Sequence, residues 1–162
     1  LPRIKGFLIN LWYMMSNTVS DKAIDAHLKE LSKSNPLESY CTNCGDCCRP
    51  SVTVKSIDRS PFKILVKGLS CKFNKSIDGN STCTVYEERF QKAGWCLDLK
   101  GMIREGVAPL DCPYVDTLKG YRPTIDLENN QYKSVLPLLK KAISSSDTSP
   151  FSNEDVDDFL GS

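Results

Sequence analysis

Four cysteines lie within eight residues in the first third of the chain. The stretch CTNCGDCCRP begins at residue 41 and contains Cys41, Cys44, Cys47 and Cys48. Cysteines this close together can bind a metal through ionised thiolates, pair with distant cysteines in disulfides, or carry out redox chemistry. Which of these they do is the main question that the sequence raises about function.

The spacing of this cluster favours metal ligation over local disulfides. Cys41 and Cys44 place two sulfurs on one tight turn, as metal-binding loops do. Gly45 lets the backbone fold back so that Cys47 can face the same point. A Cys41–Cys44 disulfide would close too short a loop to gain much stability, and a disulfide between adjacent cysteines would form a strained ring. Because neighbouring side chains diverge, we expect either Cys47 or Cys48 to serve another site, pack inside or remain a reactive thiol.

Four later cysteines lie in turn-rich or proline-flanked stretches. Eight thiols would fit two four-thiolate zinc sites, one iron–sulfur cluster with spare thiols, or two clusters. Disulfides in a secreted protein remain an alternative, because eight cysteines allow on the order of a hundred pairings. The candidate metal ligands are Cys41, Cys44, Cys47, Cys48, Cys71, Cys83, Cys96 and Cys112.

The composition excludes several other kinds of site. The 162 residues are 40% apolar and 25% charged with a net charge of +1, so no strong field argues for nucleic acid. Basic residues are scattered, and no glycine-rich phosphate loop is present. The single histidine, His27, excludes a zinc site with two cysteines and two histidines. We expect His27 to be packed or half-exposed on a helix rather than to be a ligand.

The N-terminal segment, residues 1–16, is treated apart from the domain. An apolar run from Phe7 to Met15 follows Arg3 and Lys5, which is similar to the start of a secretory signal. The run is too short to span a membrane as a helix, and no small-x-small cleavage site follows it. We therefore expect a cytoplasmic protein without a membrane span, in which thiols stay reduced.

Residues 17–143 are expected to form one cysteine-cluster metal-binding domain. Apolar residues at helical spacing predict a helix over 18–33, with a capping box from Thr18 to Asp21 and an end at Asn35-Pro36. The pattern predicts further helices and strands between turn-rich loops. The predicted strands are at 51–57 and 121–127, and a turn-rich loop is predicted at 74–82. The predicted helices are at 99–107 and 134–143, and Pro137 is expected in the first turn of the second helix. The expected fold class is a small, irregular, loop-rich α+β domain organised around Cys-ligated metal, with flanking helices at both ends.

The C-terminal tail, residues 144–162, has five acidic residues and no basic one. Serine-rich, acidic composition predicts disorder. Val156, Phe159 and Leu160 nevertheless lie at i, i+3 and i+4, so residues 150–162 could dock as a short helix on a partner protein.

The cysteine pattern is similar to that of a known family. The cluster CTNCGDCC matches the CxxCxxCC signature of the YkgJ-like cysteine cluster family. The resemblance extends over residues 38–116, through Cys71, the segment CTVYEER that begins at Cys83, Cys96, and Cys112 in DCPYV. Phe90 departs from the family pattern, which usually has proline after the arginine. The resemblance implies chelation of zinc or iron and implies no particular reaction or substrate.

Tyr86 and Arg89 are candidates for supporting the ligands. If their segment is helical, residues three apart share a face. Arg89 could donate hydrogen bonds to metal-bound thiolates, since four thiolates around zinc leave a net charge of about −2. Tyr86 could do the same through its hydroxyl. The alternative is a core tyrosine and a surface arginine.

The sequence thus predicts a metal-binding protein in which zinc or iron, including an iron–sulfur cluster, mainly fixes the loops. Zinc bound by four thiolates has no open position for substrate. A rival hypothesis is an iron–sulfur or thiol redox protein that acts as an electron carrier or oxidoreductase. A second is an adaptor that uses its acidic C-terminal tail. Whether the protein is an enzyme is left open.

Overall fold

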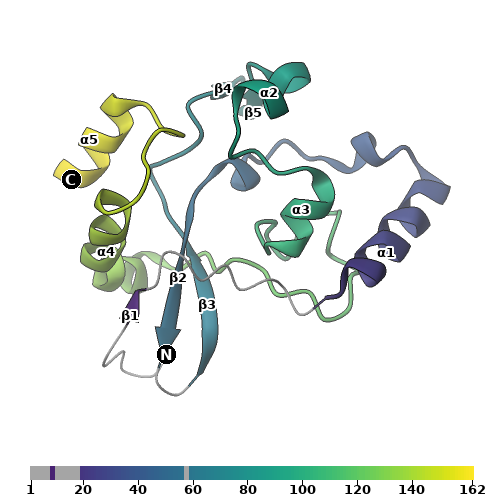
Figure 1. The fold of residues 1–162 in the computed structure, drawn as a ribbon, viewed down its shortest axis with the longest axis horizontal. Helices are drawn as coiled ribbons and strands as arrows, with labels where there is room; N and C mark the ends of the chain where they lie inside the picture. Colours follow the sequence, from purple (N-terminus) through teal and green to yellow (C-terminus); the bar gives the residue numbers. More distant parts are fainter. Residues whose placement is uncertain (1–7, 10–18, 57–58) are drawn as a thin grey trace. The chain divides into compact units, whose positions relative to one another are not determined.

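The computed structural model describes residues 8–9, 19–56 and 59–162 (Figure 1). The chain divides into two compact units. Unit 1 combines Leu1–Met15, Arg49–Cys71 and Thr124–Ser162, and unit 2 combines Ser16–Cys48 with Lys72–Pro123. Helices and small antiparallel sheets occur together, which confirms the α+β class. The domain expected over residues 17–143 includes parts of both units.

Unit 1 contains an antiparallel sheet in the order β1 (Leu8–Ile9), β2 (Ser51–Ser56) and β3 (Arg59–Leu65). The strand predicted at 51–57 is confirmed, and Val52 pairs with Ile64 in the core. The strand predicted at 121–127 is wrong. Within the described residues this stretch contributes only an isolated parallel bridge, between Ile125 and Ile64. Pro123 cannot donate to a ladder, which explains why the pairing does not extend.

Helix α4 (Asn129–Ser144) supplies much of the unit 1 core. It begins five residues earlier than predicted, so Pro137 lies in the helix interior and not in the first turn. The helix loses one backbone hydrogen bond there. Burial of Tyr132 and Val135 before the proline, and of Leu139 after it, offsets this loss.

The structure of the C-terminal tail also differs from the predicted disorder. Residues 153–161 form helix α5 (Asn153–Gly161), which lies beside α4 (Figure 1). Val156 and Phe159 are buried in the unit 1 core, and Leu160 packs against it. The expectation of disorder is therefore wrong for these residues, because their apolar stripe is satisfied within the chain. Val156, Phe159 and Leu160, the residues expected to dock on a partner protein, thus make apolar contacts within the chain.

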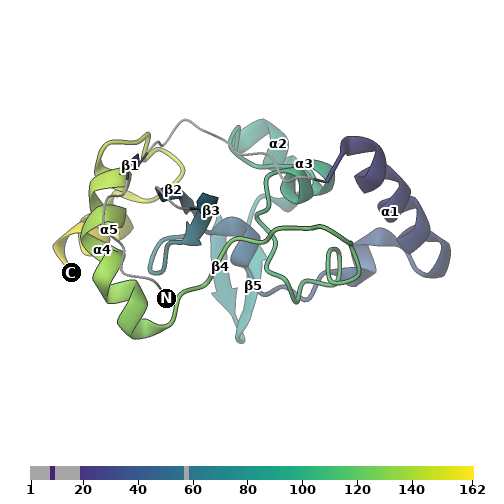
Figure 2. The same ribbon diagram turned by 90° about the horizontal axis from the view of Figure 1, so that it is seen from below.

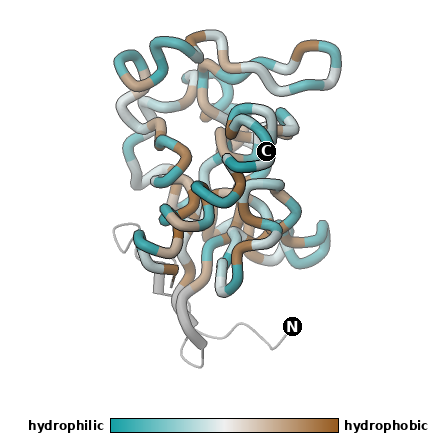
Figure 3. The backbone as a smooth tube through the Cα atoms, turned by 90° about the vertical axis from the view of Figure 1, so that its right-hand side faces the viewer, coloured by the Kyte–Doolittle hydropathy of each residue, from teal (hydrophilic) through white to brown (hydrophobic). Residues whose placement is uncertain are grey.

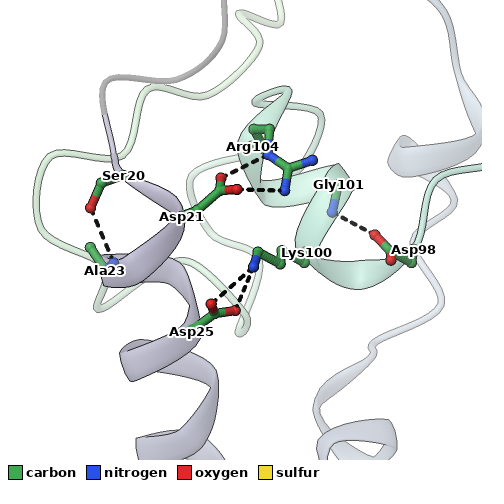
Figure 4. A network of polar contacts seen from close by, with 8 residues as sticks. All are labelled: Ser20, Asp21, Ala23, Asp25, Asp98, Lys100, Gly101 and Arg104. Atoms are coloured by element: carbon green, nitrogen blue, oxygen red, sulfur yellow. Dashed lines mark hydrogen bonds and ion pairs between the residues drawn. The ribbon is translucent and has the colours of Figure 1, made fainter.

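Unit 2 is built around α1 (Asp21–Ser34) and α3 (Leu99–Arg104), which confirm two predicted helices. The cap of α1 is Ser20, whose hydroxyl accepts from the Ala23 N–H at 3.1 Å. Thr18, the expected cap, lies outside the described residues. Two ion pairs join the helices (Figure 4), and one of them is the two-bond contact of Arg104 with Asp21 at 2.8 and 3.0 Å. Both pairs are largely exposed, so the buried Ile24 and Ile103 contribute more to the packing.

A hairpin in unit 2 replaces the loop expected at 74–82. Strands β4 (Asn74–Ile77) and β5 (Asn80–Cys83) pair antiparallel and are visible in Figure 2. Asp78 and Gly79 both have positive φ, 50° and 79°, as a two-residue type I′ turn requires. The chain then forms η3 (Tyr86–Glu88) and α2 (Arg89–Lys92).

Hydrophobic and hydrophilic residues alternate in short stretches along the backbone (Figure 3). Over the part of the chain that the structure describes, no helix has the length and apolar character needed to cross a membrane.

Candidate functional site

The cysteine loop, residues 41–48, belongs to unit 2. It follows η1 (Leu37–Tyr40) and ends in η2 (Asp46–Cys48). Asn43 and Gly45 both have positive φ, 57° and 80°, so the chain bends sharply at two nearby points. These bends keep the sulfurs of the loop on one short stretch of surface.

The β4–β5 hairpin holds this loop in place. The Ser81 N–H donates to the Asn43 carbonyl at 3.0 Å. A Cβ atom on Gly45 would lie only 2.6 Å from Ser81 Oγ and 2.7 Å from Ser81 Cβ, so the loop backbone packs directly on β5. Cys83 is two residues from Ser81 and therefore lies on the same face of the hairpin. The hairpin thus places a further cysteine on the side that the loop contacts.

Tyr114 connects the turn that contains Cys112 to η1, the segment before the cysteine loop. Its hydroxyl donates to the Leu37 carbonyl at 2.5 Å, and its ring lies 6.1 Å from that of Tyr40. Tyr40 immediately precedes Cys41, and Tyr114 follows Cys112 by two residues. The two tyrosines, which the sequence analysis did not identify, therefore bring Cys112 to the cysteine loop.

His27 takes part in the same arrangement. Its Nε2 donates to the Tyr114 carbonyl at 2.8 Å, and the residue is half-buried. The expectation of a packed histidine is confirmed. Its hydrogen bond connects α1 to the Cys112 turn.

Four thiols of this region are called the four-thiol set: Cys41, Cys44, Cys47 and Cys112. Burial raises the pKa of Cys112, and the charges of the other three thiols raise it further. Two of the sulfurs accept a hydrogen bond from the amide two residues later. The Asn43 N–H donates to Cys41 Sγ at 3.4 Å. The backbone hydrogen bond from Tyr114 partly offsets the raised pKa of Cys112, because it favours the thiolate.

Cys47 and Cys48 contact each other directly. The pKa of Cys47 is raised, first by the hydrogen bond between its thiol and that of Cys48 and then by the protein atoms that crowd its sulfur. The residue as a whole is still exposed, while Cys48 is half-buried. That one of these two cysteines serves another site, packs inside or is a reactive thiol stays a prediction.

The remaining predicted ligands lie elsewhere. Cys96 is half-buried in unit 2, beside Trp95, whose ring stacks on Phe73 with 6.0 Å between centroids. Cys71 is half-buried and belongs to unit 1. None of the eight cysteines, all of which lie in the described residues, forms a disulfide. Across residues 8–9, 19–56 and 59–162, no three His, Cys, Asp or Glu side chains converge closely enough to hold a metal ion as they stand.

Arg89 makes its contacts with neighbouring aromatic residues. Its guanidinium donates to the Tyr86 carbonyl at 2.6 Å and lies 4.0 Å from the centre of the Tyr86 ring. The centre of the Phe90 ring lies 4.3 Å from the guanidinium on another side. Both rings are about half exposed. Hydrogen bonds from Arg89 or Tyr86 to thiolates stay a prediction.

Alkaline pH should weaken unit 2 through Tyr114. Burial, and then the charge of Cys41, raise the pKa of Tyr114 to about 12, above the usual value of about 10. The folded state therefore holds this proton more tightly than the unfolded state. The stabilisation is fully present below about pH 10 and is lost as the pH rises toward about 12. Urea unfolding followed against pH should show this decline, and Tyr114→Phe should reduce it. A Tyr114→Phe chain that declines as steeply as the parent would contradict the expectation.

No protein-family model and no solved structure matches the chain. An uncharacterized protein of Methanocaldococcus jannaschii is 33% identical over 85 residues, which are 52% of this chain and 57% of that protein. The chain thus spans little more than half the length of this curated relative, and the similarity supplies no named activity.

Proposed function

We propose that this chain is a metal-binding cysteine-cluster protein whose zinc or iron mainly fixes the fold of unit 2. One observation carries the proposal: the hydrogen bond from Tyr114 to the Leu37 carbonyl, at 2.5 Å, and the 6.1 Å between the Tyr114 and Tyr40 rings join the segment of Cys112 to the start of the cysteine loop. The CxxCxxCC spacing, which resembles that of the YkgJ-like family, supports the same interpretation. The proposal requires a compartment that keeps thiols reduced, such as the cytoplasm.

The donor set suits a soft or borderline cation. Thiolates select zinc or iron–sulfur clusters over magnesium or calcium. Neighbouring thiols raise the pKa of Cys112 and the pKa of Cys47, and a bound cation would offset this effect. The backbone hydrogen bond from Tyr114 would help to hold the Cys112 sulfur ionised. Within the part of the chain that the structure describes, no three such side chains converge closely enough as they stand, so metal binding would require the four cysteine side chains to rearrange.

A structural role for the metal follows from the absence of buried side chains in the cysteine loop. Cys41, Cys44 and Cys47 are exposed, and the loop has no buried side chain of its own. A metal bound by the four-thiol set would connect the loop to Cys112, which is distant in sequence. Closing such a long loop constrains the unfolded chain and adds the binding free energy to folding. A closed four-thiolate site would leave no position for a substrate.

Metal content of three serine variants tests this proposal. We expect anaerobically purified parent protein to hold bound zinc or iron. Cys44→Ser and Cys112→Ser should lose most of it, because each removes one of four donors. Cys96→Ser is the matched control, since Cys96 lies outside the four-thiol set, and it should keep the parent's metal content. Elemental analysis of the folded fractions gives the readout. A Cys112→Ser chain with undiminished metal, or a parent with four disulfides and no metal, would refute the proposal.

An iron–sulfur or thiol redox protein is the second candidate. The contact between Cys47 and Cys48 favours it, because a fifth sulfur lies beside the four-thiol set. Visible absorbance from an iron–sulfur cluster would support electron transfer, and a colourless protein with bound zinc would support the structural role.

A further inference from the structure

The turn of the β4–β5 hairpin is formed by the only Asp–Gly pair in the sequence, Asp78-Gly79, and the sequence has no Asn–Gly pair. Aspartate followed by glycine is the aspartyl sequence that cyclises most readily, because glycine has no side chain to hinder its amide nitrogen. Both residues are exposed. Apart from its chain neighbours, nothing lies within 4 Å of the position that a Cβ on Gly79 would take. The site is therefore open enough for the two residues to react with each other.

The two groups that would react are not engaged elsewhere. Among the described residues, no hydrogen bond or ion pair holds the Asp78 carboxylate or the Gly79 amide. Other aspartates of the chain are held in place. Asp98, for example, accepts a hydrogen bond from the Gly101 N–H at 2.7 Å, and Asp147 accepts one from the Ser149 N–H at 2.9 Å.

The turn end of the hairpin can open without uncovering any core. Ile77 and Asn80 form the last pair before the turn, and both are exposed, Ile77 by 53%. Local opening costs little where few apolar contacts are lost. Each opening lets the Asp78 side chain rotate until its carboxyl carbon reaches the Gly79 nitrogen.

We propose that Asp78 converts spontaneously to isoaspartate and that this change releases the cysteine loop from the hairpin. The Gly79 nitrogen attacks the side-chain carboxyl carbon of Asp78 and forms a C–N bond. The carboxyl hydroxyl leaves as water with the amide proton. Water then opens the resulting five-membered ring at one of its two carbonyl carbons. Attack at the side-chain carbon restores aspartate, whereas attack at the backbone carbon breaks the original peptide bond and leaves the chain running through the side chain. One water is lost and one is regained, so the mass of the chain does not change.

Isoaspartate would disturb the contact that holds the cysteine loop. It adds one methylene group to the backbone of a two-residue turn whose geometry depends on positive φ at both residues, 50° and 79°. The strand that follows the turn is the one that contacts the loop. The Ser81 N–H donates to the Asn43 carbonyl at 3.0 Å, and the backbone at Gly45 packs on Ser81. Loss of the hairpin register would therefore free residues 41–48.

Incubation of parent, Asp78→Asn and Asp78→Gly chains at neutral pH tests the modification. Cleavage after Lys75 and after Arg89 isolates a peptide in which Asp78 is the only aspartate. Electron-transfer fragmentation distinguishes isoaspartate from aspartate at equal mass. In the parent, isoaspartate should accumulate at residue 78 several times faster than at any other aspartate. Asp78→Asn should react faster still, because its amide loses ammonia more readily, and its peptide should gain the mass difference between an amide and an acid.

Asp78→Gly is the matched control, because a Gly–Gly pair suits the same type I′ turn but has no carboxyl group to form the ring. Hydrogen exchange at the Ser81 amide, measured before and after incubation, reports on the contact with the loop. Exchange should become faster in the incubated parent and stay unchanged in incubated Asp78→Gly. Isoaspartate that forms no faster at residue 78 than elsewhere would overturn the modification site. Isoaspartate at residue 78 with unchanged Ser81 exchange would overturn its effect on the loop.

Discussion

Gly45→Ala should destabilise unit 2 by about 2–5 kcal/mol and lower its metal content. A left-handed backbone costs a non-glycine residue about 1–2 kcal/mol, and Gly45 has φ +80°. The new Cβ would also lie 2.6 and 2.7 Å from two atoms of Ser81, closer than real contacts. Overpacking of this kind costs about 1–3 kcal/mol. The loop would have to move off β5, which would displace Cys44 and Cys47.

Gly79→Ala is the matched control for this prediction. Gly79 has φ +79°, nearly the same as Gly45, and nothing lies within 4 Å of the position of its added Cβ. It should therefore show only the backbone cost of about 1–2 kcal/mol and keep the parent's metal content. Urea unfolding gives the free energies. With Trp12 replaced by Phe in every chain, Trp95 is the only tryptophan and reports on unit 2.

Ser81→Gly should rescue Gly45→Ala specifically. It removes both atoms that the new Cβ would meet, although it also removes the hydrogen bond between Ser81 and Asn74. A double-mutant cycle separates these effects, and we expect a favourable coupling of about 1–3 kcal/mol. No coupling, or a Gly45→Ala chain as stable as Gly79→Ala, would show that the loop does not depend on its close approach to β5.

The elements with clear periodicity could be predicted from the sequence. Helix α1 follows from the spacing of Ile24, Leu28 and Leu31, and β2 follows from its alternating valines. Only the cap of α1 was misplaced, because Thr18 and Ser20 offer similar hydroxyl groups. The β4–β5 hairpin was missed because its strands are mostly polar. The Asp78-Gly79 pair, which favours a type I′ turn, was the signal that could have revealed it.

Two errors came from giving composition or local rules too much weight. The acidic residues of the tail predicted disorder. Val156 and Phe159 are nevertheless buried in the unit 1 core, and this burial of apolar surface stabilises α5. Pro137 was expected in a first turn, but tertiary packing around it outweighs one missing hydrogen bond.

The candidate site could be predicted only in part. The cysteine loop is visible in the sequence because its members are neighbours. The approach of Cys112 depends on Tyr114, whose partners Leu37 and His27 are 77 and 87 residues away. No local pattern encodes contacts at such separation. The sequence therefore identified the thiols as candidate ligands, while the division between the four-thiol set and the other cysteines required the fold.

Ile103→Ala and Leu139→Ala should destabilise different units by about 2–5 kcal/mol each. Both side chains are fully buried, Ile103 in the unit 2 core and Leu139 in the unit 1 core. Residues 72–123, which join the two long segments of unit 1, would become a flexible loop of 52 residues if unit 2 unfolded. Loop-closure cost grows only with the logarithm of length, so unit 1 should survive this change.

Hydrogen exchange followed by mass spectrometry distinguishes the two units. Ile103→Ala should speed exchange in residues 19–48 and 72–123, and Leu139→Ala should speed it in 49–56, 59–71 and 124–162. Added zinc should slow exchange in the first group alone, since all four proposed ligands belong to unit 2. If either substitution accelerated exchange equally throughout the chain, the two units would unfold as one. The metal would then stabilise the whole protein, and its effect could not be confined to the loop that carries the cysteines.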